Sequence, residues 1–403
     1  MTTKVSSRTA YQELEDELLG QKDASAESEE DLAGLDSASL TGAVVWGTDW
    51  TAATILDQLR RQTIGLDPAF QRRDAWTDER KSRFIESLIL GLPIPQLVLA
   101  ESDRIKGKFT IIDGKQRLLS LSRFAGVGLA EGQQPLVLRG LDVRKDLNGA
   151  TYDALKGNAK FEDLVSSFEN QAIRTVVIRG WKNEEVLYII FHRLNSGSLP
   201  LSAQELRQAL HPGPFLNFVA KFSEQSEPLR KLLGLSRPDF RMRDVELVVR
   251  FYAFHMRLAE YRGNLKKFLD DTCDQLNRRW ASESKHLEKI ATKLEKAIVA
   301  ATKIFSTRHA FRKWDGTGFE ERLNRAIFDV VAHSLANPAL RSRAVEKKAE
   351  VLERFKALCL DRKFRDAIES TTKSKQAVRN RFSKWYRTLS RISGERARVA
   401  LPR

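Results

Sequence analysis

The strongest constraint on the fold is a change of pattern along the chain, because strand signals stop near residue 215 while helical periodicity continues beyond it. Residues 41–210 mix short apolar runs of strand length with amphipathic helical segments. Farther on, apolar residues recur at helical spacing, as in Val245, Val248 and Phe251, and the pattern continues through residues 270–276, 287–304, 319–335 and 344–360. A chain of 403 residues also exceeds one ordinary core. We therefore predict an α+β protein with a mixed domain at 41–214 and an all-helical domain at 215–403.

Local patterns locate the elements of the mixed domain. Thr77 is a typical N-cap for a helix that Gly91 ends, and Ser202 with Glu205 forms an S-x-x-E capping box. Asn183 is predicted to cap another helix. The predicted strands are residues 97–100, 109–112, 135–139 and 173–179.

Charge is unevenly distributed around the formal net value of +15. Residues 1–40 hold 3 Lys or Arg against 10 Asp or Glu, a net of −7, and few large apolar groups. This composition predicts a disordered or loosely helical acidic leader. Residues 341–403 carry a net of +12, with 19 Lys or Arg against 7 Asp or Glu. Such a basic segment attracts polyanions such as DNA, and a solvated helical surface is the alternative.

The C-terminal segment interleaves cations with aromatic residues. At helical spacing the cations form a broad stripe that can contact a phosphate backbone without reading a sequence. We expect Phe382 and Trp385 to pack in the core rather than to stack on bases. The cations are Arg379, Arg381, Lys384, Arg387 and Arg391, and the aromatic residues are Phe382, Trp385 and Tyr386.

Cysteine usage and hydropathy exclude several classes of protein. Cys273 and Cys359 fall in predicted helices and match no metal-ligand spacing, which argues against a disulfide framework or a structural zinc. The N-terminal residues contain no apolar run of the kind found in signal peptides. The apolar stretch 84–92 is too short to span a bilayer. We expect a cytoplasmic protein with no membrane partner.

Residues 110–118 form the segment with the clearest chemistry, because a buried strand runs through a glycine turn directly into a helix. Unpaired N–H groups and the dipole at a helix start favour an anion, above all a phosphate. Lys115 and Arg117 add cationic donors, while Asp113 can hold Mg²⁺ or orient a water. The alternative is a plain helix start with Asp113 as N-cap and Gly114 easing the turn.

Three separated segments resemble the N-terminal domain of GmrSD-type restriction enzymes. In that family they read Q-R-x-x-x-W with G-x-P-I-P, then I-D-G-Q-Q-R-L, then F-x-R-x-N with L-x-x-x-E-x-R. The similarity spans about residues 45–215, in the same order. The matching segments are residues 70–76 (FQRRDAW) with 91–95 (GLPIP), residues 112–118 (IDGKQRL), and residues 191–195 (FHRLN) with 201–207 (LSAQELR).

The resemblance implies a ParB/sulfiredoxin-like fold for the mixed domain and a nucleoside-triphosphate site at the loop. Nucleotide hydrolysis would then serve defence against foreign or modified DNA, with Mg²⁺ as the metal. Asp113, Gln116 and Arg117 would be the catalytic residues, with Asp113 also the metal ligand. Gly114 and Lys115 would bind the nucleotide.

The resemblance also implies a second wall of the site, formed by Arg72, Arg193 and Asn195. Each of these residues has a plainer interpretation. Arg72 can be a surface cation beside a packed Trp76, and Arg193 with Asn195 can end a helix. Glu205 is expected to serve mainly as the carboxylate of its capping box.

Two departures from the family pattern bear on activity. Lys115 stands where the family usually has Gln, so we expect nucleotide binding to be retained more readily than turnover. The six histidines are scattered and match no H-x-x-P, HNH or D-x-x-K context. Asp315 and Gly316 are expected to form only a turn. We therefore expect no nuclease in this chain. Either a cleaving partner is encoded separately, or the chain acts by nucleotide hydrolysis or binding alone.

Three functional hypotheses remain open from the sequence. The first is a nucleoside-triphosphate-binding, hydrolysing defence protein that acts on or near DNA. The second is a noncatalytic ParB-like DNA-binding module whose loop contacts DNA phosphates. The third is a regulatory subunit whose helical half recognises a partner nuclease.

Overall fold

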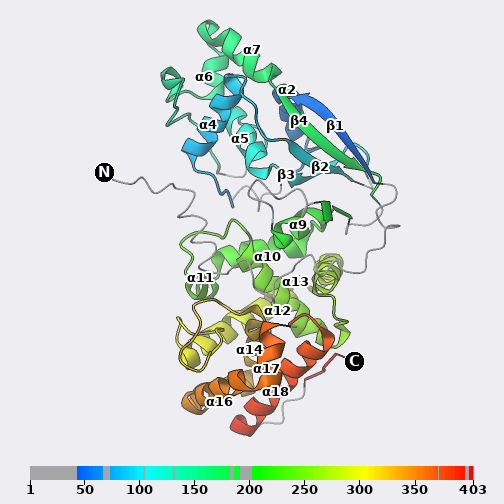
Figure 1. The fold of residues 1–403 in the computed structure, drawn as a ribbon, viewed down its shortest axis with the longest axis vertical. Coiled ribbons are helices and arrows are strands. Elements are labelled where there is room, and N and C mark those ends of the chain that lie inside the picture. The colour runs from blue at the N-terminus through cyan, green and yellow to red at the C-terminus, as the bar shows by residue number, and fades with distance from the viewer. Residues whose placement is uncertain are drawn as a thin grey trace. The chain divides into compact units, whose positions relative to one another are not determined.

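A computed structural model describes most of the chain, and its described residues divide into two compact units. The mixed unit comprises the described part of Leu32–Pro212 together with Asp239–Met242, and the helical unit comprises Gly213–Pro238 and Arg243–Arg403. The first unit is α+β and the second is built from helices, as predicted (Figure 1). The described residues are 43–66, 73–102, 105–129, 132–181, 186–187, 189–190, 202–370, 372–394 and 399–402.

The mixed unit is organised around a four-stranded sheet of order β1-β4-β2-β3 (Figure 1). Strand β4 pairs antiparallel with β1 and parallel with β2, and β2 pairs antiparallel with β3. Three strands confirm the predictions, whereas β1 is an addition to the predicted set. The strands are β1 (Val44–Thr51), β2 (Leu97–Glu101), β3 (Phe109–Asp113) and β4 (Ala172–Arg179).

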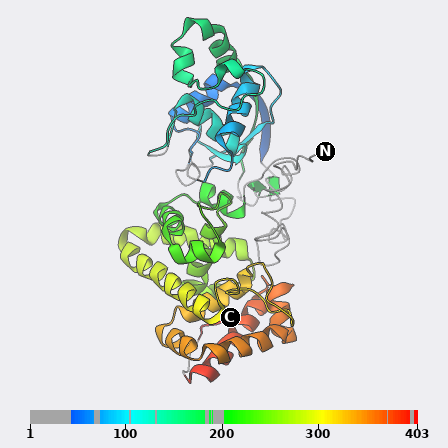
Figure 2. The same cartoon turned by 90° about the vertical axis from the view of Figure 1, so that its left-hand side faces the viewer.

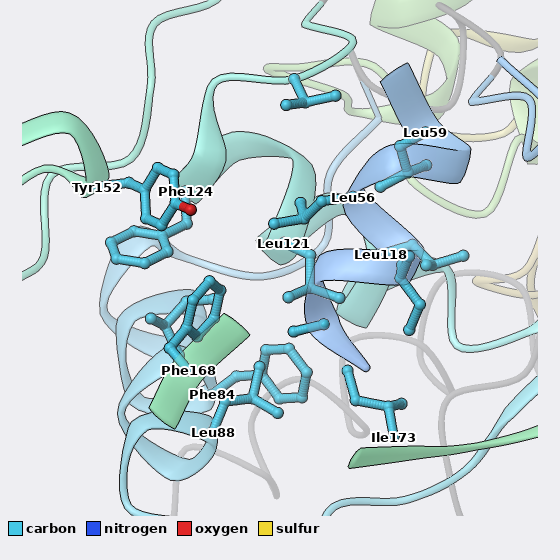
Figure 3. Close-up of a cluster of buried hydrophobic side chains, with 14 of the residues drawn as sticks. Leu56, Leu59, Phe84, Leu88, Leu118, Leu121, Phe124, Tyr152, Phe168 and Ile173 are labelled. Atoms are coloured by element: carbon cyan, nitrogen blue, oxygen red, sulfur yellow. The ribbon is translucent and has the colours of Figure 1, made fainter. Parts of the chain in front are cut away.

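Alternate residues of the strands enter two different apolar clusters, as the period of two in a strand requires. Leu97, Leu99 and Ile111 enter the larger cluster, which also contains residues of α2, α4, α5 and α7 (Figure 3). Val98 and Ile112 enter the smaller cluster on the opposite face, with Leu206 of α9 among its members. The helices of the mixed unit are α2 (Ala52–Arg60), α4 (Asp78–Ile89), α5 (Lys115–Ala125), η3 (Lys145–Leu147), α6 (Tyr152–Lys156), η4 (Ala159–Phe161), α7 (Glu162–Asn170) and α9 (Ala203–Leu210).

Two predicted helix starts are confirmed. The side chain of Thr77 accepts a hydrogen bond from the Arg80 N–H and begins α4. Ser202 and Glu205 form the predicted capping box at the start of α9. The predicted cap Asn183 lies outside the described residues.

The predicted strand at residues 135–139 is wrong. The Leu136 N–H donates to the Arg123 carbonyl near the end of α5, and the Leu138 N–H donates to the Ala150 carbonyl. The backbone hydrogen bonds of this extended segment therefore go to a helix end and a turn instead of a neighbouring strand.

The helical unit confirms the periodicity beyond residue 215, with different boundaries. One helix of 41 residues, α13, joins the two stretches 270–276 and 287–304, and Figure 2 shows it as a long yellow-green helix. The stretch predicted to be helical from Phe319 begins only at Arg325, after the cap Asn324, and a break at Lys347 separates α15 from α16. The helices are α10 (Pro214–Gln225), α11 (Glu227–Leu233), α12 (Arg243–Arg257), η5 (Leu258–Glu260), α13 (Leu265–Phe305), α14 (Arg325–Leu335), α15 (Pro338–Glu346), α16 (Lys348–Leu360), α17 (Arg362–Glu369) and α18 (Lys375–Ser393).

Both cysteines and the C-terminal aromatic residues lie in the interior of the helical unit. Cys273 in α13 and Cys359 in α16 are buried, and burial raises the pKa of the Cys359 thiol to about 12. Phe382 and Trp385 of α18 are buried, which confirms that they pack in the core. Among the described helices, none is long and apolar enough to cross a membrane.

Candidate functional site

The candidate site begins at the turn between β3 and α5. Gly114 adopts the left-handed conformation, with φ 97° and ψ 16°, and is the N-cap of α5. A Cβ atom at this position would lie 2.4 Å from Leu97 Cδ2, so the turn requires glycine. The plain-helix alternative had Asp113 as the N-cap. In the structure, Asp113 is instead the last residue of β3, and Gly114 is the N-cap. Because glycine has no side chain, it provides no side-chain acceptor for the first-turn N–H groups of α5.

Arg117 folds back over the glycine turn and pairs with Asp113. Its Nη2 lies 2.7 Å from Asp113 Oδ2, and the guanidinium is almost fully buried. The apolar neighbours Leu118 and Leu121 anchor α5 in the larger core (Figure 3). A guanidinium has five N–H donors, and the bond to Asp113 occupies one of them. The pair thus holds a cationic donor group at the start of a helix, where an anion would be stabilised.

Lys115 is held by a carboxylate from α9. Its Nζ lies 2.8 Å from Glu205 Oε1, and both side chains are only 4% exposed. The second oxygen of Glu205 accepts the Ser202 N–H in the capping box, at 2.7 Å. Glu205 therefore does more than cap its helix, and a phosphate contact by Lys115 has to compete with this buried ion pair.

Gln116 connects the loop to the first of the three family-like segments. Its Oε1 accepts the N–H groups of Ala75, at 3.3 Å, and Trp76, at 3.2 Å. Asp74 of the same segment pairs with the buried Lys81, at 2.6 Å. Residues 73–76 are thereby tied both to the loop and to α4.

A segment that the sequence did not indicate, Asp239–Met242, returns to the mixed unit and contacts the same residues. The buried Arg73 donates through Nη1 to the Asp239 carbonyl, at 2.7 Å. The backbone carbonyl of Arg241 accepts a hydrogen bond from the Ser202 hydroxyl at 2.7 Å. The guanidinium of Arg241 lies 3.6 Å from the Glu205 carboxylate. Arg73 lies inside the first family-like segment, at a position that the Q-R-x-x-x-W pattern leaves open. No pattern in residues 239–242 indicated their part in this arrangement.

The loop residues predicted for the site, Asp113–Arg117, thus lie together at one helix start. The predicted second-wall residues Arg72, Arg193 and Asn195 lie outside the described residues. Within the part of the chain that the structure describes, no group of three or more His, Cys, Asp or Glu side chains is arranged to hold a metal ion.

These features define a mixed α+β domain with a glycine-turn loop at a helix start, held by two flanking segments. The family model for the N-terminal domain of the GmrSD restriction endonuclease matches residues 53–212, a range that includes all three segments. This match confirms the resemblance of residues 53–212 to the GmrSD N-terminal domain. No curated protein and no solved structure matches the chain.

Proposed function

We propose that the mixed unit binds a nucleoside triphosphate at the Asp113–Arg117 loop and hydrolyses it in defence against foreign or modified DNA. The observation that carries this proposal is the attachment of two distant segments to one loop. Gln116 binds the backbone of Ala75 and Trp76, and Lys115 pairs with Glu205. A loop held in this way is pre-organised for its ligand.

The proposed division of labour follows the chemistry of each side chain. The first-turn N–H groups of α5 and the remaining donors of Arg117 bind phosphate oxygens. Gln116 belongs to the loop itself and is proposed to orient a water or a phosphate oxygen, although its amide oxygen is engaged by Ala75 and Trp76. From the family pattern, Arg72, Arg193 and Asn195 close the opposite wall of the site.

The donor set fits Mg²⁺ held largely by the nucleotide. Mg²⁺ commonly keeps several waters and binds through one or two carboxylates together with phosphate oxygens. Asp113 is partly exposed and supplies one such carboxylate, which it shares with Arg117. When bound, the metal would neutralise charge on the phosphates.

DNA is the proposed macromolecular partner, bound through the exposed cations of α18. Arg379, Arg387 and Arg391 are exposed, whereas Arg381 is buried against Asp329 and Lys384 pairs with Asp361. Only part of the predicted stripe is thus available to a phosphate backbone. The proposal includes a cytoplasmic location and a separately encoded nuclease as a further partner.

A second candidate function is nucleotide binding without hydrolysis, or a noncatalytic ParB-like module. The Lys115–Glu205 pair favours it, since the usual family residue at this position is Gln. A lysine buried against a carboxylate is unsuited to orienting a water.

The test is phosphate release with Mg²⁺ and each of four nucleoside triphosphates, with and without DNA. The wild type is compared with Arg117→Ala and with Arg174→Ala, an exposed arginine of β4. We expect Arg117→Ala to lower turnover by about 10²–10³, the effect of removing a donor to developing charge, and Arg174→Ala to have no effect.

Nucleotide binding is measured on the same proteins, because it separates the two candidates. Binding by the wild type that Arg117→Ala weakens, without phosphate release, favours the binding-only function. A wild type that neither binds nor hydrolyses any of the four nucleotides rejects a nucleotide site at this loop. The thermal unfolding midpoint of Arg117→Ala shows whether the variant is folded.

A further inference from the structure

A cavity in the helical unit has a chemistry that the proposed function does not use. It lies in the connection between α13 and α14 and has a volume of about 450 Å³. This volume falls in the range of small-molecule sites. Two residues of the connection, Ser306 and Phe311, have positive φ values of 70° and 61°. Positive φ is uncommon for such residues, so the connection has a defined and locally strained shape.

Two arginines line this cavity without a carboxylate partner among the described residues. Arg312 donates from Nε to the Glu321 carbonyl at 2.9 Å and from Nη1 to the Ala310 carbonyl at 3.0 Å. Arg308 is exposed and makes no hydrogen bond or ion pair with any described residue. Burial and the positive charge of Arg308 lower the pKa of Arg312. Two neighbouring guanidinium groups without a counter-ion favour an anionic ligand.

The acidic residues of the cavity form no ion pair with its arginines. Glu320 is engaged by Lys313, which also pairs with Glu369 at 2.6 Å. Glu321 is exposed at the cavity, so one carboxylate faces two arginines. The lining thus holds two arginines and two glutamates, and neither arginine forms an ion pair with a described carboxylate.

A stacked aromatic wall lies beside the arginines. The His309 ring stacks on Phe319 with centroids 4.7 Å apart and an interplanar angle of 15°. Phe319 in turn lies nearly parallel to Phe355 of α16, and Trp314 meets its edge. Phe355 and Trp314 thus hold the Phe319 ring in place. Both His309 and Phe319 line the cavity. Flat rings beside cations are the combination that binds nucleotide units, because bases stack and phosphates pair.

We propose that the Arg308–Arg312 cavity binds a nucleotide unit, with its phosphate on the two arginines and its base against the His309–Phe319 stack. The unit can belong to a free nucleotide or to single-stranded DNA, since both offer the same phosphate and base. This site is separate from the Asp113–Arg117 loop and does not depend on nucleotide hydrolysis there.

The test measures binding of a fluorescent oligothymidylate by anisotropy, and displacement of the probe by AMP. Arg308→Glu reverses an exposed charge at the cavity, and its matched control is Arg322→Glu, an exposed arginine of the same connection that does not line the cavity. We expect Arg308→Glu to weaken binding about tenfold or more, and Arg322→Glu to leave it within about twofold.

His309→Ala tests the stacking part separately, because it removes a ring without reversing a charge. We expect a loss of about fivefold or more, in the range for one base–aromatic contact. Displacement by AMP identifies a site for free nucleotides as well as strands, and binding of the oligonucleotide alone identifies strands as the source.

Equal binding by Arg308→Glu and Arg322→Glu overturns the proposal, and wild-type affinity in His309→Ala overturns the nucleotide assignment and leaves a plain anion site. Equal thermal unfolding midpoints for the variants and wild type exclude misfolding as the cause of any loss.

Discussion

The two units use buried charge in different ways. In the helical unit, Asp329 receives Arg250 in bidentate fashion, at 2.9 and 2.7 Å, and Arg381 at 3.0 Å. These three side chains come from α12, α14 and α18, and each is at most 2% exposed. In the mixed unit, buried charges hold helix starts and irregular segments instead of the middles of helices. Lys115 binds Glu205 beside the glycine turn, and Arg73 binds the carbonyl of Asp239.

The difference shows that burial of a charged side chain does not by itself indicate function. The Asp329 cluster joins regular helices and offers no turn or helix start to a ligand. Near the loop, the same kind of ion pair fixes a helix start whose backbone can receive an anion. The informative combination is a buried ion pair together with a glycine turn at a helix start.

Among the tests of this comparison, Asp329→Ala is expected to cause the largest loss of stability. Removing this carboxylate leaves Arg250 and Arg381 buried without their shared partner. We expect the free energy of unfolding to fall by about 3–5 kcal/mol. Urea denaturation measures the change.

The matched control for Asp329→Ala is Glu283→Ala, in which an acidic residue paired with one arginine on the surface of α13 is removed. It should leave the denaturation midpoint almost unchanged, because exposed ion pairs contribute little. If both variants unfold at the wild-type midpoint, the Asp329 cluster does not stabilise the helical unit.

Local patterns predicted the elements of the fold but not the contacts that complete the site. Thr77 and the Ser202–Glu205 capping box lie within a few residues of what they cap, so sequence alone located them. Arg73 and Asp239 are separated by 166 positions, and Lys115 and Glu205 by 90, so no local rule could pair them.

The errors in the predicted strands also arise from tertiary contacts that the local sequence does not contain. The apolar run at residues 135–139 resembles a strand, but its hydrogen bonds go to α5 and a nearby turn. Strand β1 contains Gly47 and Asp49, which are poor strand formers, and exposes Val44, Val45 and Trp46. Its pairing with β4 makes it a strand despite this sequence.

A smaller effect is expected at Glu86, a buried carboxylate that is held by backbone groups rather than by an ion pair. The N–H groups of Asp142, Val143 and Arg144 donate to it at 3.1, 2.9 and 2.6 Å. Burial alone would raise the pKa of Glu86, but these three hydrogen bonds outweigh it and lower the pKa below the ordinary 4.5. The stability from this carboxylate is therefore present above about pH 4.5 and lost as the pH falls through the lower folded pKa.

Glu86→Gln keeps the shape and removes the charge, so it tests this linkage directly. We expect a loss on the order of 1 kcal/mol at pH 7, which shrinks as the pH falls below 4.5. Urea denaturation at a series of pH values measures the difference, with the exposed Glu162→Gln as control. A difference that stays constant with pH would mean that the charge of Glu86 does not stabilise the fold.

The smallest effect concerns two cations of one helix, Arg387 and Lys384 in α18. Arg387 is exposed, whereas Lys384 already binds Asp361 at 2.8 Å. If α18 contacts a DNA backbone, Arg387→Ala should weaken binding a few-fold and reduce the slope of log affinity against log salt by about 1. Lys384→Ala should leave the slope unchanged, because its charge is already compensated within the fold. Anisotropy titrations with duplex DNA at several salt concentrations measure both slopes. Equal slopes for wild type and Arg387→Ala would remove the exposed face of α18 from the DNA interface, and the basic segment would then be a solvated surface.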